Sequence, residues 1–274
     1  MLGRVPRIMP LVGRPVAPLL VSLAALTLLS GCQGLGPERG AATGAAVPDI
    51  GACRVLAPAD VAHPSNDSPT VDCAEPHTAQ TFAVGTVPGD LGHTSYDDSR
   101  VAAYAYRFCT GQFIDFTGAD ESLAMRTILS WAWFRPGRAA WDHGARWFRC
   151  DVIGGGDQAK TYVDLPTDTK GLLLGRPQDE WMVCADGATV AGAVKVPCDQ
   201  KHTWRAVTTI VLGSATDAYP GDTLVQQRTK DFCSKSVGAW LDYPVDYNFG
   251  YSWFQRPEWD AGNRRSVCWA RTDR

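Results

Sequence analysis

The sequence has no cluster of lysine and arginine, and its net charge is mildly acidic. Its 274 residues include 26 basic and 29 acidic side chains, a net charge of −3. Residues 1–31, which we expect to be removed, hold three arginines and no acid, so the processed chain has 23 basic and 29 acidic residues, a net charge of −6. Nucleic acids are bound mainly by neutralising their phosphates. The composition therefore predicts no nucleic-acid partner.

The sequence also lacks the spacings typical of zinc sites and catalytic nucleophiles. No two cysteines lie as close as in the Cys-x2-4-Cys pairs that hold zinc. Ser252, in Gly-Tyr-Ser-Trp-Phe, lacks the closing glycine of a nucleophile elbow, and no Ser-x-x-Lys occurs. A zinc site and a nucleophilic cysteine beside a histidine remain alternatives. We predict no catalytic residue, no metal and no cofactor.

The apolar run at residues 16–30 is too short for a confident membrane-spanning helix, which needs about 20 residues. It follows a basic segment, the pattern of a signal peptide. It ends in Leu-Ser-Gly-Cys32, which resembles a bacterial lipobox. This resemblance implies a signal peptide over residues 1–31 and lipidation of Cys32. The alternative is an ordinary secretory signal. We expect the chain to be anchored in the cell membrane by its lipid, on the extracellular face.

Residues after Cys32 are small and rich in glycine and alanine, which predicts a flexible tether over residues 32–50. Setting Cys32 aside leaves eight of the nine cysteines, in an environment where disulfides persist. They form two sets of four in the same order: Cys53, Cys73, Cys109 and Cys150, then Cys184, Cys198, Cys233 and Cys268.

The two sets share further residues. The second cysteine of each begins Cys-x3-His-Thr, with His77 and His202. Both sets close in Trp-Asp-x-Gly-x-Arg-x3-Cys, with Trp141, Gly144 and Arg146 in the first and Trp259, Gly262 and Arg264 in the second. Such ordered similarity indicates a duplication. We predict two tandem domains, residues 51–152 and 181–274, joined by a linker over 153–180 in which three successive glycines favour flexibility.

Each domain is expected to be a small antiparallel sheet with one main helix, an α+β fold. Strand-like runs follow each His-Thr at 78–87 and 203–212. Helices are predicted over 100–112, capped by Asp97 or Ser99, and over 223–237, capped by Asp222, with the third cysteine late in each. Alternating aromatic residues at 128–134 and 247–253 predict a second strand, and the last cysteine lies in a closing strand.

These residues resemble the septum-formation domain of actinobacterial secreted and membrane proteins. The shared pattern is the set of four cysteines with Cys-x3-His and the terminal Trp-x2-Gly-x-Arg-x3-Cys. The similarity covers about residues 51–152 and 181–270. It implies a link to cell division, but no particular chemistry. Gln80 and Arg205 stand where the family usually has an acidic residue.

We interpret the repeated residues as scaffold. Four cysteines allow three pairings in each domain, and we favour first with second and third with fourth because the first two flank a short excursion. The histidines are expected to orient a strand by hydrogen bonding. The two arginines should brace an acid, such as Asp142 or Asp260, or a carbonyl, and the two glycines fit tight turns with positive φ.

Ten tryptophans and eight tyrosines are many for two small domains. Most should pack in the core, while the non-repeated Trp147 and Trp204 are candidates for an exposed binding patch. The resulting hypothesis is a non-catalytic protein that binds an envelope protein or cell-wall glycan. The alternatives are a cell-wall-modifying enzyme and an envelope-sensing ectodomain.

Overall fold

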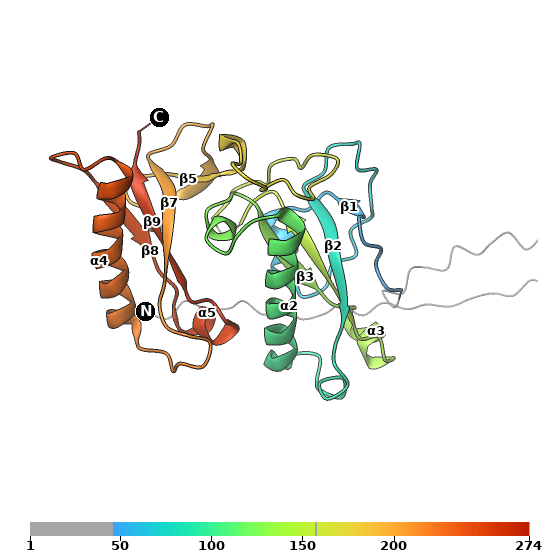
Figure 1. Cartoon of the computed structure of the whole chain (residues 1–274). Coiled ribbons are helices and arrows are strands. Elements are labelled where there is room, and N and C mark those ends of the chain that lie inside the picture. Colours follow the sequence, from blue (N-terminus) through green and yellow to red (C-terminus); the bar gives the residue numbers. More distant parts are fainter. Residues whose placement is uncertain (1–45, 157, 274) are drawn as a thin grey trace, which may run out of the picture. The chain divides into compact units, whose positions relative to one another are not determined.

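A computed structural model describes residues 46–156 and 158–273 (Figure 1). The predicted signal peptide, Cys32 and most of the predicted tether lie outside the described residues. Within the described ranges, no helix has both the length and the apolar character needed to cross a bilayer. We call residues 46–156 the N-terminal half and residues 158–273 the C-terminal half.

The N-terminal half is a four-stranded antiparallel sheet with one long helix. Its strand order is β1-β2-β4-β3. The elements are β1 (Cys53–Arg54), α1 (Pro58–Val61), β2 (Ala79–Thr86), α2 (Ser99–Thr117), the 3-10 helix η1 (Leu123–Met125), β3 (Ser130–Phe134), α3 (Arg138–Asp142) and β4 (Trp147–Ile153).

The C-terminal half repeats this order and adds one strand. Its five-stranded antiparallel sheet has the order β6-β5-β7-β9-β8. The elements are the 3-10 helix η2 (Asp179–Trp181), β5 (Val183–Asp186), β6 (Val194–Pro197), β7 (Trp204–Val211), α4 (Asp222–Trp240), β8 (Phe249–Ser252), α5 (Arg256–Ala261) and β9 (Arg265–Arg271). The fold is thus mixed α+β with two antiparallel sheets, as expected.

The two sheets agree residue by residue. In β2–β4, Cys150 lies opposite Ala83, and in β7–β9, Cys268 lies opposite Thr208. Both central strand pairs shift register at the same place, just before Ala83 and just before Thr208. A bulge bends and twists a strand locally. Its recurrence at one position gives both sheets the same distortion where the last cysteine lies.

Four disulfides pair the first cysteine with the second and the third with the fourth in each half. The pairs are Cys53–Cys73, Cys109–Cys150, Cys184–Cys198 and Cys233–Cys268. The second and fourth join the long helices α2 and α4 to β4 and β9. The helical cysteines lie near the middle of their helices, not late in them, because α2 and α4 continue to Thr117 and Trp240.

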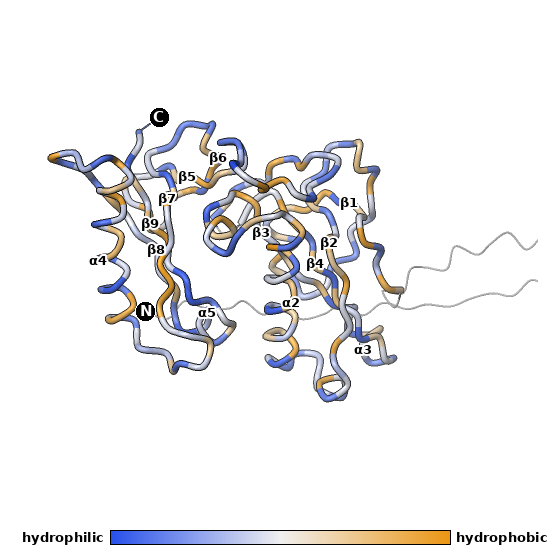
Figure 2. The backbone as a smooth tube through the Cα atoms, viewed as in Figure 1, coloured by the Kyte–Doolittle hydropathy of each residue, from blue (hydrophilic) through white to orange (hydrophobic). Residues whose placement is uncertain are grey.

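The long helices begin differently from expectation. Asp98 is the N-cap of α2, and its side chain accepts a hydrogen bond from the Arg100 backbone N–H. Asp97 instead pairs with Arg138 at 2.6 Å. The N-cap of α4 is Gly221 at φ 93°, a conformation that glycine adopts without steric cost. Both helices alternate hydrophobic and hydrophilic residues along their length, as one-sided packing requires (Figure 2).

The sheet faces that point away from the long helices differ in chemistry. In the N-terminal half, Arg54 donates to the Thr81 hydroxyl at 2.8 Å, which donates to Asp151 at 2.7 Å. Arg149 donates to the same carboxylate at 2.9 Å. In the C-terminal half, the positions paired like Thr81 and Asp151 are the apolar Ala206 and Trp269. One backbone frame therefore holds a buried ionic network in one sheet and an apolar cluster in the other.

The described residues of the segment 153–180 are packed, contrary to the flexibility expected from its glycines. The Gly154 N–H donates to the Thr78 carbonyl at 3.0 Å, and a Cβ on Gly154 would lie 2.0 Å from the Val163 carbonyl oxygen. Leu165 and Leu173 are buried in the core. The glycines allow close backbone approach here, because a side chain would not fit.

The helix-to-sheet disulfide is expected to be the more stabilising one of the N-terminal half. Cys109 and Cys150 are 41 residues apart, and Cys53 and Cys73 are 20 apart. Replacing the first pair by alanine should lower the free energy of unfolding by about 4 kcal/mol, and the second pair by about 3 kcal/mol, because longer closed loops restrict the unfolded chain more. Urea unfolding followed by circular dichroism measures both. A smaller loss for the first pair would contradict this ranking.

Candidate functional site

The closing motif of each half is a tryptophan–arginine clamp. Arg146 Nη1 donates to the Trp141 carbonyl at 2.6 Å, and its guanidinium lies 4.2 Å from the centre of the indole ring. Arg264 makes the same bond to the Trp259 carbonyl at 2.5 Å and lies 3.6 Å from the ring centre. The arginines thus brace carbonyls, as one of the expected options stated.

The other option, an acid such as Asp142 or Asp260, does not apply. Asp260 pairs with Arg256 instead, at 3.3 Å. The Nε atoms of the two clamp arginines also donate to carbonyls in neighbouring loops, at Gly92 and Ser214. Gly144 and Gly262 have φ of 96° and 113°, as expected for tight turns. The clamp is structural: it locks the turn before the last strand.

The repeated histidines serve the local backbone. In His77, Nδ1 lies 2.9 Å from the Glu75 carbonyl oxygen, and in His202 it lies 2.7 Å from that of Gln200. A carbonyl can only accept, so Nδ1 carries the proton. Nε2 of His77 is buried, and it has no hydrogen-bond partner among the described residues. This arrangement agrees with the predicted role in orienting the start of a strand.

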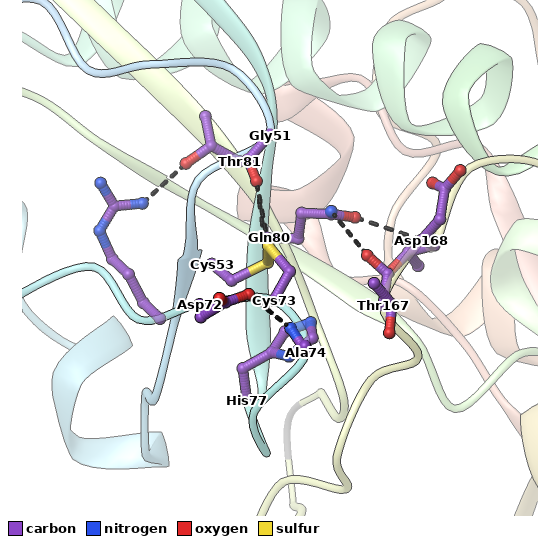
Figure 3. Close-up of a disulfide and its surroundings, with 12 residues drawn as sticks. Gly51, Cys53, Asp72, Cys73, Ala74, His77, Gln80, Thr81, Thr167 and Asp168 are labelled. Carbon is purple, nitrogen blue, oxygen red and sulfur yellow. Dashed lines mark hydrogen bonds between the residues drawn. A yellow bond between two sulfur atoms is a disulfide. The ribbon is translucent and has the colours of Figure 1, made fainter.

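The first disulfide lies beside a turn in which the Asp72 carboxylate accepts a hydrogen bond from the Ala74 N–H at 2.9 Å (Figure 3). Its cysteines are bonded to each other, and Gln80 points away from it to bind the segment 167–169 through the Thr167 carbonyl and the Thr169 N–H. Among residues 46–156 and 158–273, no three His, Cys, Asp or Glu side chains come together as a metal-binding group. The geometry here is that of a scaffold.

A groove of about 940 Å³ is the best candidate for binding. We call it the aromatic groove. One wall comes from α2 and the edge strand β3, and another from the turn between α5 and β9. Its lining includes Tyr106, Glu121, Trp131, Trp133, Glu258 and Arg265. Of the repeated motif residues, only Gly262 and Arg264 line it. The other motif residues and all eight paired cysteines do not.

Aromatic rings line part of the groove. The rings of Tyr106 and Trp131 lie 5.0 Å apart at 59°, and Trp133 follows two residues later on the same face of β3. Burial, followed by the Glu258 carboxylate, raises the pKa of Tyr106, so its hydroxyl stays protonated and able to donate. Half-buried rings with a polar edge are common where proteins bind ligands.

Charged groups line the rim. Arg265 pairs with Glu121, and its Nη1 also donates to Thr209 at 3.2 Å. The period-two spacing of the sequence identified Trp131 and Trp133 as one face of a strand. Tyr106, Glu121 and Glu258 carried no such signal, because they reach the groove from separate elements.

The two tryptophans expected to be exposed are buried. Trp147 is 7% exposed and Trp204 is 6% exposed. Trp204 Nε1 donates to the Gly187 carbonyl at 3.0 Å. The expectation rested on the absence of a repeat, but both residues sit on central strands, where packing covers them. The predicted Trp147/Trp204 patch is wrong.

One amine has an unusual environment. Lys195, on β6, lies 4.3 Å from the centre of the Trp269 ring, and burial lowers its pKa from 10.5 to about 8. Lys195 does not line the aromatic groove.

Replacing the arginine of either clamp by lysine should destabilise the fold. Arg146→Lys or Arg264→Lys loses the planar stack and one donor, so each should lower the free energy of unfolding by about 1–2 kcal/mol. Arg256→Lys is the matched control, since this side chain is 69% exposed, and should stay within about 0.5 kcal/mol of the parent. Urea unfolding of the three variants measures this. Equal losses for all three would disprove the clamp.

Stability should depend on pH through Lys195. Between pH 8 and 10.5 the unfolded chain holds a proton that the folded chain has lost, so the parent gains stability as pH rises through this window. Lys195→Met should show no such gain. The difference in unfolding free energy between the two proteins, measured at pH 7.5 and pH 10, isolates the lysine from other groups. A difference that does not change with pH would contradict this assignment.

Comparison with known proteins gives one match. A family model described as "Septum formation" matches residues 50–268. Neither the curated proteins nor the solved structures contain a match to the chain. Membership of this family suggests a role related to the septum or cell envelope. Because the model spans both sheets and all eight paired cysteines, the chain belongs to the septum formation family.

Proposed function

We propose that this is a lipid-anchored, non-catalytic protein of the extracellular cell surface that binds cell-wall glycan through the aromatic groove. The anchor is Cys32, at the end of the lipobox-like Leu-Ser-Gly-Cys. Four disulfides support a location outside the reducing cytoplasm. We also propose, from the family resemblance, that it is a secreted or membrane protein of the actinobacterial type.

The chain would carry two tandem copies of one domain, residues 51–152 and 181–274. The same order of the four corresponding strands, equal disulfide pairing and a bulge at the same position support a duplication. Equal bracing of Trp141 and Trp259 by an arginine supports it further. These correspondences are independent of one another, and unrelated sheets would not share them all.

The observation that carries the binding proposal is the Tyr106–Trp131 pair in a groove with a charged rim. Ring faces can stack against the apolar faces of sugars, while Glu258 and Arg265 are placed to bind hydroxyl and carboxylate groups. Among the described lining residues, no serine or threonine hydroxyl is hydrogen-bonded to a histidine or a carboxylate, which favours binding over catalysis.

Removing Trp131 should weaken retention on cell wall at least about tenfold, as expected for an aromatic anchor. The matched control is Phe249→Ala. Phe249 occupies the same place on β8 that Trp131 has on β3, since their partners are Ala270 and Val152, but it lies outside the groove lining. Co-sedimentation of the purified chain with cell-wall sacculi measures retention, and circular dichroism checks folding.

Three outcomes separate the alternatives. Equal retention of both variants would reject the groove as the binding site. Release of soluble sugar fragments, abolished by Trp131→Ala, would indicate a cell-wall-modifying enzyme. No retention of the parent, with a protein captured instead by crosslinking in cells, would indicate an envelope protein as the partner or a sensory role.

A further inference from the structure

In the N-terminal half, the segment that follows the long helix α2 is paired with the chain that enters the C-terminal sheet. We call residues 119–129 the first exit segment. Its Ile128 N–H donates to the Trp181 carbonyl at 3.0 Å, and its Arg126 carbonyl accepts from the Val183 N–H at 2.9 Å. Thr127 and Met182 form the β-bridge between these bonds. The chain leaving α2 is therefore paired with the chain entering β5.

Side chains reinforce this contact. Ile128 is buried in an apolar cluster whose other members belong to the C-terminal half, among them Val183 and Trp204. Ser122 and Thr209 hydroxyls lie 2.9 Å apart, and Glu121 pairs with Arg265. The first exit segment thus attaches one sheet to the start of the next.

The corresponding segment of the C-terminal half is exposed. We call residues 241–248 the second exit segment; it projects beyond the end of α4 (Figure 1). Val245 is 98% exposed and Tyr243 is 74% exposed, and the neighbouring Trp240 is 48% exposed. Several adjacent exposed apolar side chains of this size mark an interaction surface.

This segment is nonetheless held in a defined shape. The Tyr243 N–H donates to the Gly238 carbonyl at 2.8 Å, and the Tyr247 hydroxyl donates to the Ser234 carbonyl at 2.7 Å. A Cβ on Gly238 would lie 2.7 Å from that hydroxyl, so glycine makes room for it. A loop tied to α4 presents its apolar side chains at lower entropic cost than a free one.

The first exit segment pairs with residues 181–183, which we call the acceptor. The acceptor also has an exposed counterpart in the N-terminal half. Because Cys184 and Cys53 occupy the same place in the two sheets, Trp181 corresponds to Ile50, three residues before the cysteine. Ile50 is 67% exposed, and the nearby Val47 is 63% exposed. The chain therefore leaves two segments exposed. One is the second exit segment, which we call the donor, and the other is the acceptor counterpart around Ile50.

We propose that the second exit segment docks on residues 47–52 of a second copy of this chain. The contact repeats between molecules the one that the first exit segment makes within the molecule. Donor and acceptor are different surfaces, so the association is head-to-tail and extends into rings or filaments. Asp242 and Asp246 on the loop and Asp49 beside Ile50 have like charge, so added salt should strengthen this contact.

The test uses the full chain in mild detergent and sedimentation velocity over a range of protein concentrations. The parent should self-associate, and Val245→Asp should weaken this about thirty-fold, the effect of losing a central interface residue. The charge control is Leu224→Asp, near the start of α4 and far along it from the loop, which should associate like the parent. Val245 is too exposed for its substitution to affect folding.

Mixing two variants establishes the polarity. Val245→Asp keeps its acceptor and Ile50→Asp keeps its donor, so each alone should be monomeric and an equimolar mixture should form one-to-one pairs. If Ile50→Asp still dimerises alone, the contact is loop to loop and the proposal fails. It fails equally if the parent stays monomeric at every concentration, or if a photo-crosslinker at position 245 labels lipid and not residues 47–52 in membranes.

Discussion

The rest of the structure depends on the disulfide that joins each long helix to a central strand of its sheet. Cys109–Cys150 and Cys233–Cys268 are completely buried and reach the sheet just beyond its bulge. A helix fixed at its middle to a central strand has one face committed to the sheet. Its exposed face, its exit segment and the edge strand beside it are then free to differ between the halves.

They do differ, and the differences give the molecule its two candidate surfaces. In the N-terminal half, α2 and β3 contribute Tyr106 and Trp131 to the aromatic groove. The first exit segment of this half is hydrogen-bonded to the start of the C-terminal sheet. In the C-terminal half, the exit segment is uncovered. The two halves thus share one arrangement of strands and helix, yet one contributes an edge strand to the groove and the other a projecting loop.

The buried charges show how far the frame tolerates different side chains. Arg149 binds the Asp151 carboxylate directly, and Arg54 reaches it through the Thr81 hydroxyl. Burial, followed by the charge of Arg149, lowers the pKa of Arg54. Arg149 also donates two hydrogen bonds to Asn66, one to its carbonyl and one to its side-chain oxygen. A buried network of this kind adds little to the stability of the fold, because the desolvation of the charges offsets their attraction. Its contribution is to favour one particular packing of the side chains. The apolar cluster around Trp269 occupies the same place in the other sheet.

The sequence by itself determined the repeated features. Cysteine order gave the two sets, alternation placed Trp131 and Trp133 on one face, and the closing motif predicted positive φ at Gly144 and Gly262. These depend on local spacing, which a sequence carries directly. Only the tertiary structure decided the cap at Asp98, the burial of Trp147 and Trp204, and the packing of Gly154 against Val163. The aromatic groove also required it, because Tyr106, Trp131 and Glu258 come from three elements whose approach depends on packing between residues distant in the chain.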